Sequence, residues 1–348
     1  MKGDFVFAVP GDLDTPTGGY AYDKRIIAEL RELGWRPQVI NLGEGFPYPS
    51  ALTRATAKAK LEDVPKGRAI VIDGLAFGVM PVEAEELSKT HPLIAMVHHP
   101  LALESGVTPE DAKALRESER KALSFTHAVI VNSQTTADAL ADYGVPAEHI
   151  TVARPGTDRV SIAPRHHQGP VALLTVGSLV PRKGYDVLIE ALATLIDLPW
   201  HLTIVGDARD SATASQVRAA IEQHKLGPRT SLLGAVSASR LTELYPLSDL
   251  FVLPSRYEGF GMAYAEAIAY GLAVVGTTAG AIPEVVPETA GVLVPPGDAP
   301  ALAAALRRLI ESPRERARLA EGARLAAQHL PTWAESAKLF SDAIERVV

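Results

Sequence analysis

A glycine-containing turn stands between an apolar run and a predicted helix in the segment 253–271, LPSRYEGFGMAYAEAIAYG. The pattern predicts that this helix starts near Met262 and ends before Gly271. Unpaired amides at such a helix start, together with the helix dipole, favour an anion. Because Gly259 and Gly261 carry no side chain, a phosphate or a sugar can approach the backbone closely. The segment therefore predicts an anion-binding turn.

Two acids, Glu258 and Glu266, lie on either side of this turn. Eight residues of continuous helix would rotate them by about 80° from each other. Because Glu258 precedes the helix, its direction is free, and both acids can face one pocket. Carboxylates suit sugar recognition, since each accepts hydrogen bonds from vicinal hydroxyls. The alternative is an acid that complements the helix dipole plus an exposed Glu266, but the apolar neighbours of Glu266 favour the binding role.

Two cations, Arg182 and Lys183, stand at a second turn between a strand and a helix, in VGSLVPRKGYDVLIEAL (176–192). Both are well placed to neutralise a diphosphate, and the arginine can do so with two hydrogen bonds. Taken alone, this motif is more typical of a basic surface loop.

The first half of the chain contributes a glycine pair, Gly18 and Gly19, just before a predicted helix that Thr17 can cap. The pair makes another close-approach site. Its spacing does not match the G-x-G-x-x-G fingerprint that follows a strand in dinucleotide-binding folds, which counts against an NAD enzyme.

A histidine pair, His98 and His99, ends an apolar run at VHHP. Either ring can donate a hydrogen bond to a sugar or assist a proton transfer. Adjacent residues on a strand point to opposite sides, and no third ligand with suitable spacing is apparent, so no metal site is predicted. Arg154 and Asp158, in ARPGTD, are lesser candidates for the same region.

Short apolar runs rich in Val, Ile and Leu are the elements that would position these residues. Continuous apolar runs are typical of strands buried on both faces of a parallel sheet, and helical patterns such as Tyr22 to Leu33 lie between them. The pattern therefore predicts doubly wound α/β domains. The runs are 5–9, 37–42, 69–73, 93–99, 128–133 and 150–154 in the first half, and 171–178, 201–207, 230–236, 250–255, 273–278 and 291–296 in the second.

The strand–helix pattern occurs twice, separated by the polar linker PRHHQGP (164–170). We therefore expect two Rossmann-like domains, 1–165 and 166–330, that face each other across a cleft at the carboxyl ends of their strands. The segment 331–348 shows apolar residues at helical spacing and predicts a C-terminal helix. Those residues are Trp333, Ala337, Phe340, Ile344 and Val347.

Composition narrows the class of protein further. The 348 residues are 47% apolar and 22% charged, with a net charge of −7, which does not favour a nucleic-acid surface or a polybasic membrane anchor. The absence of cysteine excludes disulfides, thiolate metal sites and cysteine nucleophiles. No signal peptide and no apolar run of about 18 residues is evident, so we expect a cytoplasmic protein without a transmembrane helix. The oligomeric state is not indicated.

Together these segments resemble the retaining glycosyltransferases of family 4, which have the GT-B fold. The similarity covers most of the second half, where PSRYEGFG…EA contains the acid pair of the E-x7-E pattern, and it extends to the glycine pair, VHHP and ARPGTD. The resemblance implies that Glu266 holds the ribose of a nucleotide, that Glu258 contacts the donor sugar and that Lys183 contacts the diphosphate. It also implies that the C-terminal helix crosses back to the first domain.

The resemblance assigns further contacts to the donor. The backbone of Gly259, Phe260, Gly261 and Met262 would lie along the sugar and diphosphate, and Ala235-Val236 would flank the base. From the first domain, Gly18 and Gly19 would approach the diphosphate and His98 would touch the donor sugar. The family usually has arginine directly after the strand glycine, where this chain has Ser178, and Arg182 is the candidate replacement.

The reaction that this resemblance implies is a metal-independent transfer with retention, in which the acceptor hydroxyl attacks the face that the nucleotide leaves. UDP-glucose is the first expectation for the donor, followed by GDP-mannose and UDP-N-acetylglucosamine. The segment 54–68 is only mildly basic, which favours a small molecule or a glycan as acceptor over a lipid. A sugar-nucleotide 2-epimerase, a phosphorylase-like enzyme and a non-catalytic binding protein are the alternatives.

Overall fold

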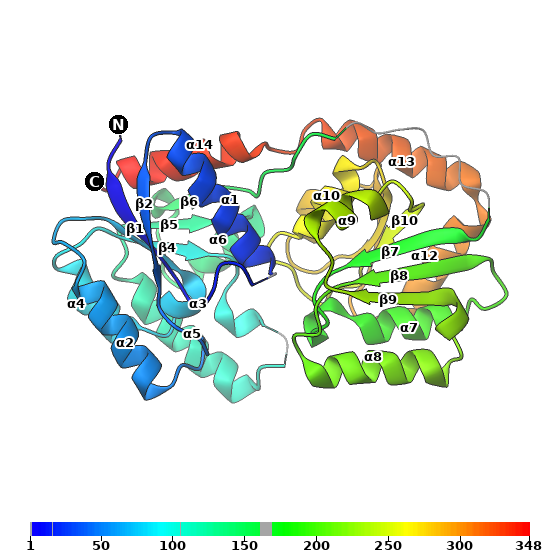
Figure 1. Cartoon of the computed structure of the whole chain (residues 1–348), viewed down its shortest axis with the longest axis horizontal. Helices are drawn as coiled ribbons and strands as arrows, with labels where there is room; N and C mark the ends of the chain where they lie inside the picture. The colour runs from blue at the N-terminus through cyan, green and yellow to red at the C-terminus, as the bar shows by residue number, and fades with distance from the viewer. Residues whose placement is uncertain (1, 16, 105, 161–168) are drawn as a thin grey trace. The chain divides into compact units, whose positions relative to one another are not determined.

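The computed structural model describes residues 2–15, 17–104, 106–160 and 169–348. The chain forms two compact units, one of Met1–Gly156 with Pro331–Val348 and the other of Thr157–Leu330 (Figure 1). The predicted boundary at 165/166 and positions 164–168 of the predicted linker lie outside the described residues. The division between the units comes earlier, after Gly156.

The first unit contains a parallel six-stranded sheet in the order β2-β1-β3-β4-β5-β6. The order reverses between β1 and β3, so the loops that follow these neighbouring strands leave toward opposite faces. The strands are β1 (Asp4–Val9), β2 (Arg36–Asn41), β3 (Ile70–Asp73), β4 (Leu93–Val97), β5 (Ala128–Val131) and β6 (Ile150–Val152). The helices are α1 (Gly18–Glu32), α2 (Ala51–Glu62), α3 (Gly74–Phe77), α4 (Pro81–Ser88), α5 (Pro109–Leu123), α6 (Gln134–Ala141) and α14 (Trp333–Glu345).

Alternation along β1 divides the core of this unit between the two faces of the sheet. Val6 and Ala8 join the apolar cluster under α2, α4, α5 and α6. Phe7 points to the other face, where its ring stacks on Phe340 of α14 with centroids 6.0 Å apart. Because the run is apolar at every position, its residues pack against helices on both faces of the sheet, as expected for a parallel sheet.

Helix α14 is held to this unit along its whole length. Its capping box at Thr332 and Glu335 fixes the start, and the backbone there passes so close to Gly156 that a Cβ on this glycine would lie 2.3 Å from the Trp333 nitrogen. Near its end, Ser341 Oγ accepts hydrogen bonds from Trp35 Nε1 at 2.9 Å and from the Lys2 ammonium at 2.8 Å. Figure 1 shows the helix beside α1.

The second unit contains a second parallel six-stranded sheet, in the order β12-β11-β10-β7-β8-β9. The order reverses between β7 and β10. The strands are β7 (Val171–Val176), β8 (Trp200–Val205), β9 (Thr230–Gly234), β10 (Leu250–Val252), β11 (Ala273–Thr277) and β12 (Gly291–Val294). The helices are α7 (Tyr185–Ala193), α8 (Ser211–Gln223), α9 (Ala238–Leu244), α10 (Met262–Ala269), α11 (Ile282–Val285), α12 (Ala299–Glu311) and α13 (Pro313–Ala327).

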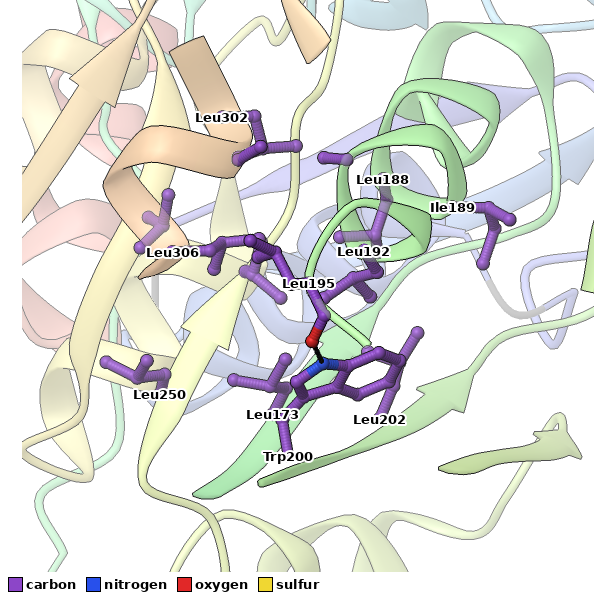
Figure 2. Packing of buried hydrophobic residues seen from close by; sticks show 14 of the residues in the cluster. Leu173, Leu188, Ile189, Leu192, Leu195, Trp200, Leu202, Leu250, Leu302 and Leu306 are labelled. Atoms are coloured by element: carbon purple, nitrogen blue, oxygen red, sulfur yellow. Dashed lines mark hydrogen bonds between the residues drawn. The ribbon is translucent and has the colours of Figure 1, made fainter. Parts of the chain in front are cut away.

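The core of the second unit also has two layers. Leu250 and Val252 of β10 face the cluster under α7, α8 and α12, whereas Phe251 faces the cluster under α9, α10 and α11. Figure 2 shows the first cluster, in which leucines of α7 and α12 gather above the sheet. The buried Trp200 indole donates to the Leu195 carbonyl oxygen at 2.7 Å, so its one polar group is satisfied.

Each predicted run contains a strand, but most strands end earlier than their runs; β1 and β3 are the exceptions. The runs 93–99 and 250–255 continue past β4 and β10, because the last paired residues are Val97 and Val252 and prolines follow within three positions. Thr17 caps α1 by accepting from the Tyr20 amide, so that helix starts four residues before the predicted Tyr22. No helix within the described ranges has the length and apolar character to cross a bilayer.

Candidate active site

The reversal between β7 and β10 in the second unit brings together the loops that follow these two strands. Ligands of open α/β sheets bind at such a point, outside the carboxyl ends of the strands. The loop after β7 carries Arg182 and Lys183 in a short 3-10 turn, and the loop after β10 carries Glu258. Topology therefore assembles the two predicted cations with one predicted acid.

Glycine at 184 allows these two loops to touch. Gly184 has a φ of 68°, and a Cβ there would lie 2.1 Å from the Pro254 carbonyl oxygen. The Arg256 amide then donates to the Arg182 carbonyl oxygen at 2.7 Å, and the Arg256 guanidinium holds Asp186 with two hydrogen bonds of 2.8 and 2.6 Å. The contact between the loops is thus fixed on the main chain as well as by side chains.

Glu258 is the centre of a buried charge cluster. Its Oε1 accepts from Lys183 Nζ and from Ser255 Oγ, both at 2.6 Å, and its Oε2 accepts from Arg182 Nη1 at 2.9 Å. Its side chain is 7% exposed, against 14% for Lys183 and 18% for Arg182. The carboxylate is therefore paired on both oxygens.

These contacts decide the protonation of Glu258. Burial raises the pKa of this carboxyl, but the charges of Lys183 and Arg182 and the hydrogen bonds to Lys183 and Ser255 outweigh burial and lower the pKa to about 2. Glu258 is consequently an anion at neutral pH, and it shares its charge between two cations.

Hydrogen bonds to the backbone also hold the loop that carries Glu258. The Ala281 amide donates to the Glu258 carbonyl oxygen at 2.9 Å, and a Cβ on Gly280 would lie 2.3 Å from that oxygen. Thr277, at the end of β11, donates to the Ser255 carbonyl oxygen at 2.6 Å. The third strand of the region therefore braces the turn that carries the acid.

Glu266 lies in a different environment, within helix α10. It is half-buried in α10, and Tyr245 Oη donates to its Oε2 at 2.8 Å. The Tyr245 ring stacks on Tyr270 with centroids 4.7 Å apart. Burial raises the pKa of Glu266, the Tyr245 hydrogen bond lowers it and the charge of Asp158 raises it, with a net rise. The alternative of an exposed helical acid does not describe this contact.

The start of α10 has the form that the glycines predict. Gly261 is its N-cap with a φ of 99° and makes no side-chain capping bond, and the Tyr264 and Ala265 amides already donate to the Gly261 carbonyl oxygen, so the amides of Met262 and Ala263 are the ones that a ligand can use. The Phe260 side chain is in the core, so only its backbone can meet a ligand, and Met262 is half-buried.

The remaining candidates of the second unit lie at the same edge of the sheet. Ala235 is exposed and Val236 half-buried, directly after β9. Ser178 follows Gly177 at the end of β7, and a Cβ on Gly177 would lie 3.3 Å from the Lys183 side chain. Asp158 is exposed, and its charge acts on Glu266.

In the first unit, the structure brings His98 and Gly19 together but leaves Gly18 exposed. A Cβ on Gly19 would lie 3.3 Å from His98 Cδ2. His98 Nε2 is 3.2 Å from Asp23 Oδ1 and 3.7 Å from Asp73 Oδ2. His99 contacts Glu104 instead, and its Nε2 lies 3.3 Å from Glu104 Oε2. Arg154 is exposed, and its carbonyl oxygen accepts a hydrogen bond from the Ser336 hydroxyl.

Asp23 and Asp73 are the site residues that sequence reasoning missed. The argument that His98 has no third partner of suitable spacing considered only near neighbours, whereas these acids come from α1 and from the end of β3. A signal was present: Asp23 precedes Ile26, Ile27 and Leu30 by three, four and seven residues, which places a carboxylate on the apolar face of its helix.

The two sheets and their flanking helices define the GT-B class of glycosyltransferases. Sucrose-phosphate synthase from Thermosynechococcus elongatus is 20% identical and has a TM-score of 0.85, with 99% of each chain covered. HepE from Anabaena, solved in complex with UDP and glucose, is 19% identical with a TM-score of 0.76, and 98% of this chain and 99% of that chain are covered.

Sequence similarity narrows the class to a family. The chain matches "Glycosyl transferases group 1" over residues 159–326 and "Glycosyltransferase Family 4" over residues 75–160. D-inositol 3-phosphate glycosyltransferase of Corynebacterium glutamicum is 30% identical over 286 residues, which is 73% of this chain and 67% of that protein. MMP alpha-(1->4)-mannosyltransferase of Mycolicibacterium hassiacum is 28% identical over 327 residues, covering 87% and 77%. The chain belongs to the family 4 glycosyltransferases, and it is a transferase enzyme.

Proposed function

We propose that this enzyme transfers a hexose from a nucleoside diphosphate sugar to an acceptor hydroxyl with retention of configuration. The observation that carries the proposal is the cluster of Glu258, Arg182 and Lys183 at the strand-order reversal of the second sheet. It combines an anion that accepts from hydroxyls with two cations that bind phosphate.

The cluster suits a reaction in which negative charge grows on a leaving diphosphate. Arg182 and Lys183 stabilise that charge, and the amides at the start of α10 add to it. Two fixed cations supply what a divalent ion would otherwise provide, so the proposed transfer is metal-independent. The acceptor hydroxyl attacks the face that the nucleotide leaves, and a donor phosphate oxygen takes up its proton.

Arg182 replaces the family arginine for which this chain has Ser178. The guanidinium lies on Glu258 beside Lys183, which supports the replacement. Arg182→Ala should lower kcat by roughly 100-fold, the scale of losing one preorganised donor to a developing anion. Arg307→Ala, which removes a surface partner of Asp197, is the matched control and should leave kcat unchanged.

UDP-glucose is the proposed donor, and GDP-mannose is the competing one. HepE has been solved in complex with UDP-glucose, and MMP alpha-(1->4)-mannosyltransferase and mannosylfructose-phosphate synthase of Agrobacterium fabrum carry mannosyl in their names. For the acceptor, the name D-inositol 3-phosphate glycosyltransferase points to a small polar molecule. We propose a small molecule or a glycan as acceptor.

The test is a donor panel with UDP-glucose, GDP-mannose and UDP-N-acetylglucosamine, first by thermal shift and then by transfer to a mixture of small polyols, sugar phosphates and oligosaccharides. Binding to the donor should raise the melting temperature by mass action. The product should keep the anomeric configuration by NMR, and excess EDTA should not reduce the rate. An inverted product would rule out retention, and a rate abolished by EDTA and restored by Mg²⁺ would rule out metal independence.

A further inference from the structure

Asp23 is a buried carboxylate without ordinary hydrogen-bond donors. It is 0% exposed, and neither of its oxygens accepts a hydrogen bond within the described residues. Among the described residues its cationic partner is His98, whose Nε2 is also buried and lies 3.2 Å from Asp23 Oδ1. A buried carboxylate is costly unless it is paired, so a proton must lie between Asp23 and His98 Nε2.

Asp73 completes the cluster from the end of β3. Its Oδ1 caps α3 by accepting from the Leu75 amide at 2.7 Å, and its Oδ2 lies 3.7 Å from His98 Nε2. Burial raises the pKa of Asp73, and the adjacent charge of Asp23 raises it further. Asp73 therefore keeps its proton to a higher pH than an ordinary carboxyl group does.

His98 responds in the opposite sense. Burial lowers its pKa, but the charge of Asp23 and its close contact with the His98 ring outweigh burial, Asp73 adds to the rise when it is ionised, and the pKa is raised to about 9. The other neighbouring titratable group is Tyr22 of α1, whose ring meets His98 edge-on at 5.6 Å and whose hydroxyl donates to the Ala153 carbonyl oxygen at 2.9 Å. Tyr22 is thus occupied elsewhere, and the acids determine the charge of His98.

We propose that Asp23 is a positioning residue that holds His98 as an imidazolium, with Nε2–H directed at Asp23 and Nδ1–H left as a charged donor for the ligand. Asp73 acts as the protonated neighbour that donates to Asp23. The proposal rests on the proposed function only in taking the ligand to be the sugar nucleotide.

The protons balance in this arrangement. Because burial and the charge of Asp23 raise the pKa of Asp73 to about 7, Asp73 keeps its proton below that pH, and a positive His98 beside a negative Asp23 then leaves the buried cluster neutral. With Nε2 directed at Asp23, the proposed arrangement leaves Nδ1 as the ring nitrogen for a ligand. An N–H⁺ donor recognises oxygen lone pairs, and a charged donor forms the stronger hydrogen bond. Gly19 contributes by lacking a Cβ, which would press against the His98 ring.

The first experiment measures the His98 ring directly, by NMR titration of the free protein labelled with ¹⁵N-histidine and assigned with His98→Gln. Wild-type His98 should remain doubly protonated at pH 8. In Asp23→Asn its pKa should fall by roughly one to three units. Asp73→Asn keeps an acceptor for the Leu75 amide and a donor for Asp23, so it should change the His98 pKa much less. Asp63→Asn, an exposed acid at the end of α2, is the matched control.

The second experiment separates positioning from folding. At pH 8, Asp23→Asn should raise the KM for the sugar nucleotide roughly fivefold, as expected when a charged hydrogen bond becomes a neutral one. At pH 6, where the variant His98 is protonated again, KM should recover, whereas a merely structural defect would not respond. If Asp23→Asn fails to fold, the Asp73→Asn titration and a wild-type pH profile still test the charge state.

Two results would overturn the proposal. One is a His98 that titrates identically in wild type and Asp23→Asn. The other is a stoichiometric shift of the His98 signals by Zn²⁺ or Mn²⁺ that both Asp→Asn variants abolish, which would make the cluster a metal site. If no sugar nucleotide binds at all, the proposed function fails, but the titration of the free protein still decides the charge state of His98.

Discussion

Lys183 and Glu258 form an ion pair almost completely removed from water, with Nζ 2.6 Å from Oε1 and the side chains 14% and 7% exposed. Arg182 joins from the other carboxylate oxygen. Two positive charges against one negative charge leave the cluster with a net +1. The enzyme can thus present positive charge to a diphosphate without burying two bare cations, which would be costly.

Glu258→Gln should lower both turnover and stability. The amide keeps the shape of the side chain but leaves Lys183 and Arg182 without their anion, and removal of one partner from a buried pair costs about 3 kcal/mol. We expect the transfer rate to fall and the melting temperature to drop together. Glu104→Gln, an exposed acid beside His99, should change neither. An unchanged rate in folded Glu258→Gln would contradict the assigned role.

The free energy of unfolding should depend on pH through the pairing of Glu258 with Lys183 and Arg182. The pKa of Glu258 is lowered from 4.5 to about 2, so its contribution is fully present above pH 4.5 and is lost as the pH falls toward 2. A pKa lowered by that much in the folded state contributes about 3 kcal/mol to the free energy of unfolding at neutral pH. Urea unfolding of wild type and Glu258→Gln should therefore differ most at pH 7 and converge near pH 2 to 3. A difference that stays constant with pH would show that the charge is not the cause.

Glu266 and Tyr245 should govern the binding of nucleoside diphosphate. Glu266→Ala removes the proposed ribose acceptor and should weaken UDP binding by roughly tenfold in calorimetry. Tyr245→Phe removes a hydrogen bond that lowers the pKa of Glu266, so its effect should be larger at pH 6 than at pH 8. Glu243→Gln, an exposed acid of α9 paired with Arg240, serves as control. Equal affinity in Glu266→Ala would remove Glu266 from the site.

Replacing Gly184 by alanine should destabilise the protein more than replacing Gly297, a glycine with a similar backbone conformation. Gly184 and Gly297 have φ values of 68° and 78°, but a Cβ would meet Pro254 at 2.1 Å in the first and nothing within 4 Å in the second. Gly297→Ala should cost roughly 1–2 kcal/mol for the left-handed backbone. Gly184→Ala should cost at least about 2 kcal/mol more, because the loops must separate. Equal melting temperatures would show that the loops move apart freely.

Most of the fold could be predicted from the sequence because parallel strands leave a strong local signal. Every apolar run contains a strand, and glycine at 34 and 271 follows the helices that it was expected to end. The ends of the strands were less predictable, since Val97 and Val252 are set by the last hydrogen-bonded partner and not by hydropathy.

The site was predictable in its residues but not in its pairing. Turn chemistry identified Glu258, Glu266, Arg182 and Lys183, because glycines and charges at strand ends are visible locally. That both cations hold Glu258, and that Tyr245 holds Glu266, follows from sheet order and loop contact. Asp23 was missed because one acid in an amphipathic helix is identifiable only when its partners are known.

Helix α14 completes the first unit although the whole second unit separates it from the rest of the first unit in the sequence. During translation, Phe7 and Trp35 therefore lack their partners Phe340 and Ser341 until the second unit has been made. The two units therefore do not mature in the order in which they are translated: Thr157–Leu330 is contiguous and can fold on emergence, whereas the first unit must wait until α14 has been made. A chain stopped before α14 would leave Phe7 and Trp35 without these partners, open to chaperones and to aggregation.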